Sequence, residues 1–236
     1  MGSAYKRVLI KISGEALGGE KGSGYDMPFV SRVCEAVKTC LNKGVQVGIV
    51  IGGGNFWRGV KDGAGKIERT TADRMGMLAT AMNCMAVSDV FRQQGVDARV
   101  MTAFDIQGAG ERFDVKQAKE YLETGKVVLF GCGTGHPFFS TDTAAVLRAA
   151  EIGADAILLA KNIDGVYSAD PRKDATAVKL DDISYSEVLA MRLQVMDSTA
   201  TSLAMDNGLP VIVFALADPE NIIRVCSGEK IGSFVH

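Results

Sequence analysis

The chain has 236 residues, of which 47% are hydrophobic and 23% are charged, a balance typical of a globular protein with a sizeable core. This composition excludes a disordered tail, a collagen-like fibre and a coiled coil. The formal net charge is −2, so no overall basic field attracts nucleic acid or an anionic membrane, and we expect neither as a partner. No apolar run approaches the roughly 18 residues that a membrane helix needs.

The first residues, MGSAYKRVLIKIS, pass directly into a strand-like pattern. They lack the apolar segment and the cleavage site of a secretory signal peptide. Five cysteines are scattered along the chain without a C-x-x-C pair, which favours buried thiols over disulfides. We therefore expect a cytoplasmic protein.

Short β-branched apolar runs recur along the chain and are typical of strands buried on both faces of a parallel sheet. They are Arg7–Ile12, Val45–Ile51, Ala98–Thr102, Lys126–Phe130, Ala156–Ala160 and Val211–Ala215. Helical spacing between them predicts helices over Pro28–Asn42, Arg69–Gln94, Asp114–Glu123, Thr143–Ile152, Ser184–Asn207 and Pro219–Ser227. This alternation predicts an α/β fold with a mostly parallel sheet, in one domain over residues 1–236.

The predicted helix Arg69–Gln94 carries Met75, Met77, Met82 and Met85, which we expect to fill the core. Asp73, near the start of this helix, either interacts with the helix dipole or accepts hydrogen bonds from ligand hydroxyls. Glycine clusters at residues 18–24 and at Gly63 and Gly65 indicate loops.

Polar or glycine-rich segments follow four of the predicted strands. They are Lys11–Glu15, Gly52–Gly59, Gly131–Asp142 and Lys161–Pro171. Because ligands of open α/β sheets bind at the carboxyl ends of the strands, we expect these segments to meet at one site. The triple glycine of the second segment exposes backbone N–H groups that suit a phosphate, although a tight packing turn would explain it too. Lys11 and Arg58 add cations that could neutralise phosphoryl charge.

Two carboxylates near these strand ends have both a structural and a functional interpretation. Asp142 lies in a segment where helix capping by Ser140, Thr141 or Asp142 is a sufficient structural explanation. A helix N-terminus that faces the site would also favour the binding of anions. Asp170 fits a turn, and it could also hold Mg²⁺ or nucleotide hydroxyls.

Several catalytic signatures are absent from the sequence. There is no G-x-x-x-x-G-K-[ST] motif, no G-x-G-x-x-G before the first helix, no H-E-x-x-H and no G-x-S-x-G, and there are two histidines. These absences argue against a P-loop, a dinucleotide site, a zinc site and a nucleophilic triad.

Taken in order along the chain, five segments resemble the bacterial uridylate (UMP) kinases. The segments are Lys11–Leu17, Gly52–Gly59, Asp73–Thr80, Thr134–Thr143 and Asp164–Pro171. The resemblance implies the amino-acid kinase fold, a three-layer α/β/α domain with a mostly parallel central sheet that is unrelated to P-loop kinases. It also implies phosphoryl transfer from ATP to UMP with Mg²⁺, in a homohexamer activated by GTP and inhibited by UTP.

The same resemblance implies the roles of individual residues. Lys11, Arg58 and Asp142 would be catalytic, with Lys11 bridging the transferred and leaving groups and Asp142 organising the lysines and the metal. The ATP contacts would be Lys11, Ile12, Ser13, Gly14, Gly54, Arg58, Lys161 or Asn162, Tyr167 and Asp170. The UMP contacts would be Gly53, Asp73 (on the ribose), Thr134, Gly135, His136, Pro137, Phe138, Phe139, Ser140 and Thr141. The segment implied in GTP activation is Gly19, Glu20, Lys21, Gly22, Ser23 and Gly24.

We expect in-line transfer without a covalent intermediate, since the UMP phosphate is already an anionic nucleophile, and Mg²⁺ is expected to arrive with ATP rather than on protein ligands. Position 136 is His where many UMP kinases carry Asn. Two alternatives stay open: a related kinase acting on a carboxylate or carbamate, and a non-catalytic protein that binds or stores nucleotide.

Overall fold

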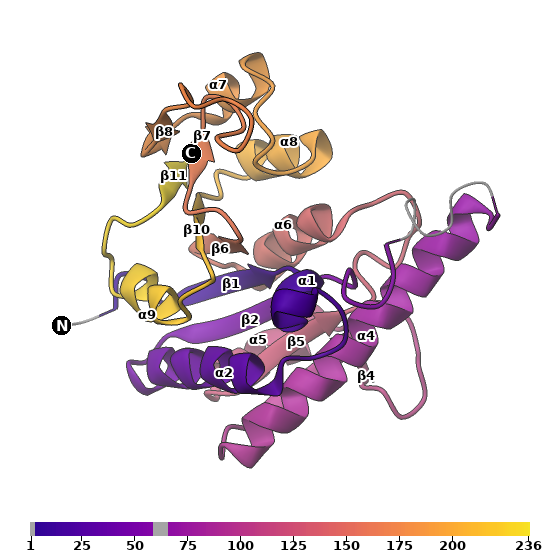
Figure 1. The fold of residues 1–236 in the computed structure, drawn as a ribbon. Coiled ribbons are helices and arrows are strands. Elements are labelled where there is room, and N and C mark those ends of the chain that lie inside the picture. The colour runs from indigo at the N-terminus through magenta and orange to yellow at the C-terminus, as the bar shows by residue number, and fades with distance from the viewer. Residues whose placement is uncertain (1–2, 59–65) are drawn as a thin grey trace.

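The structure is a computed structural model that describes residues 3–58 and 66–236 (Figure 1). Gly59 and the loop expected at Gly63 and Gly65 lie outside the described residues. Within them, a central sheet has nine strands in the order β4-β3-β5-β2-β1-β6-β10-β11-β9. Every neighbouring pair is parallel except β10 and β11. The predicted α/β class with a mostly parallel sheet is therefore confirmed.

The six predicted strands all form, with ends that shift by no more than one residue. They are β1 (Arg7–Ile12), β2 (Gln46–Ile51), β3 (Ala98–Thr102), β5 (Val127–Gly131), β6 (Ala156–Lys161) and β10 (Val211–Ala215). Short strands that the sequence analysis missed extend the sheet: β4 (Glu111–Arg112), β9 (Asp182–Ile183) and β11 (Ser233–Val235). A separate hairpin joins β7 (Val166–Tyr167) and β8 (Lys179–Leu180). Two- and three-residue strands leave no detectable apolar alternation, which explains why they were missed.

Helices cover both faces of the sheet and make it the middle of three layers (Figure 1). One face packs against α2 (Met27–Asn42), α4 (Arg69–Gln93) and α9 (Glu220–Cys226). The other packs against α5 (Val115–Glu123), α6 (Thr141–Ile152), α7 (Tyr185–Ala190) and α8 (Ser198–Asp206). Along β1, Val8, Ile10 and Ile12 face the first layer and Leu9 faces the second. Burial on both faces explains why these strands are almost continuously apolar.

The single helix predicted over Ser184–Asn207 is wrong, because the chain forms the two helices α7 and α8 there. Ser184 and Glu187 form a capping box that starts α7. Arg192 then adopts a φ of 54°, a left-handed conformation that is incompatible with a continuous α-helix. Asp197 caps the start of α8 by accepting from the Ala200 N–H. The local capping signals override the continuous helical spacing.

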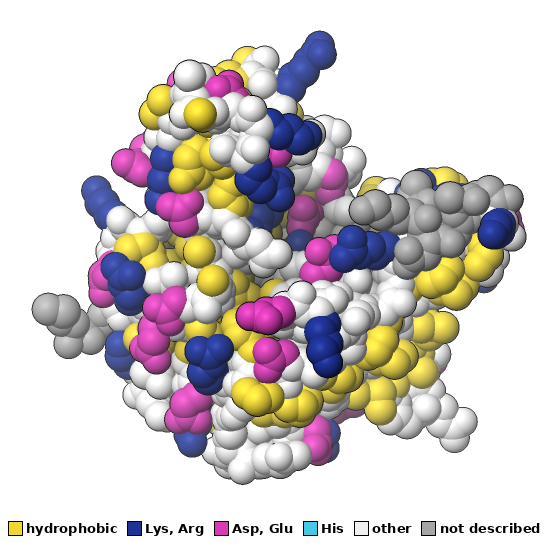
Figure 2. Space-filling model, in the orientation of Figure 1, with side chains coloured by type: hydrophobic (Ala, Val, Ile, Leu, Met, Phe, Trp, Pro, Cys, Tyr) yellow, Lys and Arg dark blue, Asp and Glu magenta, His cyan; other side chains and the backbone are white. Residues whose placement is uncertain are grey.

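The expectation that the methionines of α4 fill the core holds only for Met77, which is 7% exposed. The other three methionines lie at the surface, where Met75 is 36% exposed, Met82 49% and Met85 42%. Leu78 lies there too and is 46% exposed. One side of α4 packs on the sheet and on α2, and the hydrophobic side chains of its other side lie on the surface along the course of this helix (Figure 2). Among the described residues, no helix is both long enough and apolar enough to cross a bilayer.

Candidate active site

Two glycine turns meet at the carboxyl edge of the sheet. One follows β1 and opens the short helix α1 (Gly14–Leu17), and the other is the triple glycine after β2. A Cβ at Gly14 would lie 2.3 Å from the Gly52 carbonyl oxygen and 2.7 Å from the Gly54 nitrogen. A Cβ at Gly53 would lie 2.8 Å from the carbonyl oxygen of Gly76 in α4. These glycines are therefore required for the close approach of the turns.

Lys11 and Asp142 form a largely buried ion pair beside these turns. Lys11 follows Leu9 on the sheet face that α6 covers, and its Nζ lies 2.6 Å from Asp142 Oδ1 in the first turn of α6. The two side chains are 12% and 18% exposed. Among the described residues, Oδ1 has no hydrogen-bond partner with directional geometry, so its contact with Lys11 is an attraction between charges at close range. Ser140 caps α6 by accepting from the N–H groups of Asp142 and Thr143, which selects one of the three caps expected.

Lys161, the last residue of β6, adds a second ammonium to this ion pair. Burial lowers the pKa of the Lys161 ammonium; the Asp142 carboxylate raises it and the Lys11 charge lowers it further. Its Nζ donates to the Val195 carbonyl, which ties β6 to the loop between α7 and α8. One carboxylate thus pairs with the Lys11 ammonium and also attracts that of Lys161, and this excess of positive charge suits the oxygens of a phosphate.

A cavity of about 880 Å³ opens from this cluster and lies within the size range of ligand pockets. Of the residues expected to contact ATP, its lining includes Lys11, Ser13, Lys161, Asn162, Tyr167 and Asp170. Both members of the pair left open, Lys161 and Asn162, reach the cavity, but Lys161 is the one beside Asp142 and Lys11. We call this space the donor cavity.

The wall of the donor cavity is held by polar contacts within the loop after β6. Tyr167 Oη donates to Asp164 Oδ1 at 2.9 Å, which lowers the pKa of Asp164 and raises that of Tyr167. Hydrogen bonds from Arg172 lower the pKa of the Asp170 carboxyl. Arg58, also expected to contact ATP, is outside the lining of this cavity, and its guanidinium lies 3.1 Å from Glu15 in α1.

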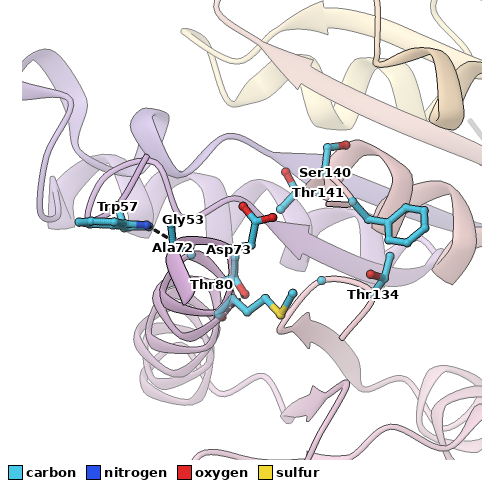
Figure 3. A pocket seen from close by; sticks show the side chains of 12 residues that line it. Gly53, Trp57, Ala72, Asp73, Thr80, Thr134, Ser140 and Thr141 are labelled. Carbon is cyan, nitrogen blue, oxygen red and sulfur yellow. Dashed lines mark hydrogen bonds between the residues drawn. The ribbon is translucent and has the colours of Figure 1, made fainter. Parts of the chain in front are cut away.

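A second cavity of about 160 Å³ lies between α4 and the segment after β5 (Figure 3). Its lining includes six of the residues expected to contact UMP: Gly53, Asp73, Thr134, Phe139, Ser140 and Thr141. Gly135, His136, Pro137 and Phe138 belong to the same segment but do not line the cavity. We call this space the acceptor cavity. Gly53 and Thr141 connect it to the glycine turns and to the start of α6.

Asp73 joins the two walls of the acceptor cavity. One of its oxygens, Oδ2, accepts from the Phe138 N–H at 2.8 Å, and Arg69 Nε donates to both carboxylate oxygens at 2.9 and 2.8 Å. The Arg69 guanidinium lies over the Phe138 ring, 5.3 Å from its centre. Phe138 has a φ of 72°, a left-handed conformation that is rare for a bulky residue and marks a constrained segment.

The sequence analysis missed three residues that shape the site. Trp57 and Thr80 line the acceptor cavity, and the Thr80 hydroxyl accepts from the Cys132 N–H at 2.8 Å (Figure 3). Asp197 accepts from the hydroxyls of Ser140 and Thr143, so α8 supports the start of α6. Asp197 was detectable as a helix cap, but no local pattern connects it with Ser140.

The segment expected to respond to GTP forms a short 3₁₀ helix over Gly19–Lys21. Gly19, Gly22 and Gly24 adopt φ values of 57°, 61° and 66°. The Gly24 N–H donates to the Asn55 carbonyl at 3.2 Å, directly after the triple glycine. The segment therefore lies next to the glycine turn after β2 and outside the linings of the donor and acceptor cavities.

Comparisons with known proteins agree with this geometry. The family model described as the amino acid kinase family matches residues 6–215. The crystal structure of UMP kinase from Bacillus anthracis is 36% identical, with 98% of this chain and 96% of that chain covered and a TM-score of 0.94. UMP kinase from Ureaplasma parvum is 34% identical over 98% of both chains, with a TM-score of 0.91. Uridylate kinase from Archaeoglobus fulgidus is 27% identical over 97% of this chain and 99% of that chain, with a TM-score of 0.77. The chain therefore belongs to the amino acid kinase family, and its fold is that of the UMP kinases within it.

Proposed function

We propose that this protein is a UMP kinase, which transfers the γ-phosphoryl group of ATP to UMP and yields UDP and ADP for pyrimidine nucleotide synthesis in the cytoplasm. The observation that carries the proposal is the cluster of Lys11, Lys161 and Asp142. The two lysines line the donor cavity, and Asp142 directly follows Thr141, which lines the acceptor cavity. Full-length similarity to the UMP kinases of two bacteria supports the choice of acceptor.

The arrangement suits catalysis by positioning and charge stabilisation. Donor and acceptor phosphates would meet across the glycine turns, where backbone N–H groups and the two lysines face the transferred group. A UMP phosphate is already an anionic nucleophile, so the site needs no general base. Asp142 would keep both ammonium groups directed at the reacting phosphates through its charge.

The described residues fit a Mg²⁺ ion that is carried by the nucleotide. Within residues 3–58 and 66–236, no three His, Cys, Asp or Glu side chains come together as a metal site. Asp142, whose Oδ1 lies 2.6 Å from Lys11 Nζ, supplies a carboxylate, the class of oxygen ligand that Mg²⁺ prefers. Asp142 would hold the ion together with the ATP phosphates, and the bound ion would neutralise charge on those phosphates.

A coupled ADP-release assay with ATP and Mg²⁺ tests the function, with UMP, CMP, dUMP, glutamate and carbamate offered as acceptors. We expect turnover with UMP and none with glutamate or carbamate. Turnover with a carboxylate or carbamate alone would move the chain to a different kinase of the same family. ATP binding without turnover on any acceptor would instead indicate a binding or storage protein.

Regulation belongs to the same proposal. We expect GTP to activate the enzyme and UTP to inhibit it. The glycine turns after β1 and β2 would face the phosphates, and we call them the phosphate-facing turns. The contact between Gly24 and Asn55 supports a link from the Gly19–Gly24 segment to these turns. The same assay with added GTP or UTP tests this. An unchanged rate with both nucleotides would contradict it.

The exposed face of α4 supports assembly of several copies, and a hexamer is part of the proposal. Met75, Leu78, Met82 and Met85 form one stripe, and their spacing reads the same in both directions around position 80. Two antiparallel copies of α4 would therefore match Met75 with Met85 and Leu78 with Met82, in a two-fold interface. The same symmetry would bring Glu68 of one copy opposite Arg92 of the other, a favourable pair of charges.

Leu78→Glu should disrupt this assembly, because it places charges at the centre of an apolar interface. By light scattering coupled to size exclusion, we expect wild type at about six times the 25.0 kDa chain mass and the variant at a smaller mass. Val178→Glu is the matched control, since Val178 is 62% exposed on a different surface. An unchanged assembly in Leu78→Glu would exclude α4 as the interface.

A further inference from the structure

Two asparagines are buried beneath the phosphate-facing turns. Asn55 follows the triple glycine and is 4% exposed, and Asn83 in α4 is fully buried. Their amides bond each other in both directions: Asn83 Nδ2 donates to Asn55 Oδ1 at 2.8 Å, and Asn55 Nδ2 donates to Asn83 Oδ1 at 3.0 Å. We call these two residues the amide pair.

The remaining donors of the amide pair are directed at backbone carbonyls. Asn83 Nδ2 donates to the Gly52 carbonyl at 2.7 Å, and Asn55 Nδ2 donates to the Gly24 carbonyl at 2.9 Å. Because a carbonyl can only accept, these two contacts determine which end of each side chain carries the nitrogen. Both NH₂ groups then use both of their hydrogens, and both side-chain oxygens accept, so the network is complete.

The amide pair also supports the turn after β1. A Cβ at Gly14 would lie 2.7 Å from Asn55 Oδ1, so this turn packs directly on the pair. Three glycine-containing segments, at Gly14, Gly52 and Gly24, are thus placed against α4 by the same two side chains. Neither asparagine lines the donor or the acceptor cavity.

We propose that Asn55 and Asn83 are positioning residues for phosphoryl transfer, which set the distance between the two phosphate-facing turns without touching either nucleotide. Glycine turns have great conformational freedom, and their N–H groups work only when they are held at the reacting phosphates. A complete buried network on α4 supplies that rigidity, because each of its groups would be left unsatisfied if a turn moved. The inference rests on the proposed kinase function.

Asn83→Ala tests the proposal. The variant removes the hydrogen bond to the Gly52 carbonyl and both hydrogen bonds to the Asn55 amide. We expect the triple glycine to shift by about 1 Å and kcat to fall by about a hundredfold. The KM for UMP should change much less, because the Asp73 contacts lie on another part of α4. Asn55→Ala should reproduce the loss, and the double variant should be no worse than either single one, since both remove the same unit.

Val87→Ala is the matched control, because Val87 is 2% exposed on the same helix and its side chain has no hydrogen-bonding group that could join the amide pair. Kinetics are compared well below the melting temperatures of all variants. A role in stability alone predicts that Val87→Ala and Asn83→Ala lower the melting temperature and leave kcat unchanged, which would overturn the proposal. If Asn83→Ala does not fold, Asn55→Ser serves in the same comparison.

Nucleotide binding separates this inference from the proposed function. If wild type binds ATP in calorimetry but does not phosphorylate UMP, the proposed function fails and the positioning role is still tested by ATP affinity. Weaker ATP binding in Asn83→Ala, with Val87→Ala unchanged, would then support the role. Equal affinity and equal kcat in Asn83→Ala and wild type would refute it.

Discussion

Lys11→Ala is expected to lower kcat by about a hundred- to a thousandfold, the usual effect of removing one preorganised group that stabilises transition-state charge. Lys11 lines the donor cavity, its Nζ lies 2.6 Å from Asp142 Oδ1, and it does not line the acceptor cavity. The KM for UMP should therefore change only a few-fold, because the Lys11 ammonium would stabilise the phosphate most strongly in the transition state, when charge moves onto the bridging oxygen. Steady-state kinetics with UMP varied at saturating ATP measure the two parameters separately.

Lys116→Ala is the control for this variant, because it removes the same charge from an exposed position on α5. Its kcat should equal that of wild type. A normal kcat in Lys11→Ala would remove Lys11 from the mechanism. A large rise in KM for UMP with little loss of kcat would place Lys11 in acceptor binding instead.

Asp142→Asn is expected to lower kcat by about ten- to a hundredfold, because the two lysines lose the carboxylate that directs them. The variant should also change the pH dependence. Burial already lowers the pKa of the Lys161 ammonium, and Asp142 raises it. Without the carboxylate this pKa falls further, so Lys161 loses its proton at a lower pH and the alkaline limb of kcat/KM for ATP moves to lower pH.

The pH profile of kcat/KM for ATP, measured for wild type and Asp142→Asn, tests this sign. Asp206→Asn serves as the control, since Asp206 is an exposed carboxylate at the end of α8. An alkaline limb that stays in place, or moves to higher pH, would show that Lys161 does not carry the titration.

Much of the fold was predictable from local patterns. Runs such as Arg7–Ile12 and Val211–Ala215 have a conformation set mainly by β-branched side chains that are buried on both faces. The site segments were predictable too, because the carboxyl ends of parallel strands must share one edge. That argument located Lys11, the triple glycine and Asp142 without stating which side chains touch.

The pairings inside the site depend on contacts between distant parts of the chain. Asp73 accepts from the Phe138 N–H across 65 positions, and Asn83 contacts Asn55 across 28. A helical Asn in the sequence looks like any polar residue, and nothing local shows that it is fully buried. Its role depends on where the triple glycine packs against α4.

The sequence by itself determined the α/β alternation, the six main strands and the segments that meet at the carboxyl edge of the sheet, because these follow from periodicity and from strand ends. Only the tertiary structure decided which face of α4 stays uncovered, that Asp197 also holds Ser140 and Thr143 at the start of α6, and which buried amides support the glycine turns. Helical spacing shows that side chains share a face, but whether that face meets a sheet or solvent depends on the elements packed around it.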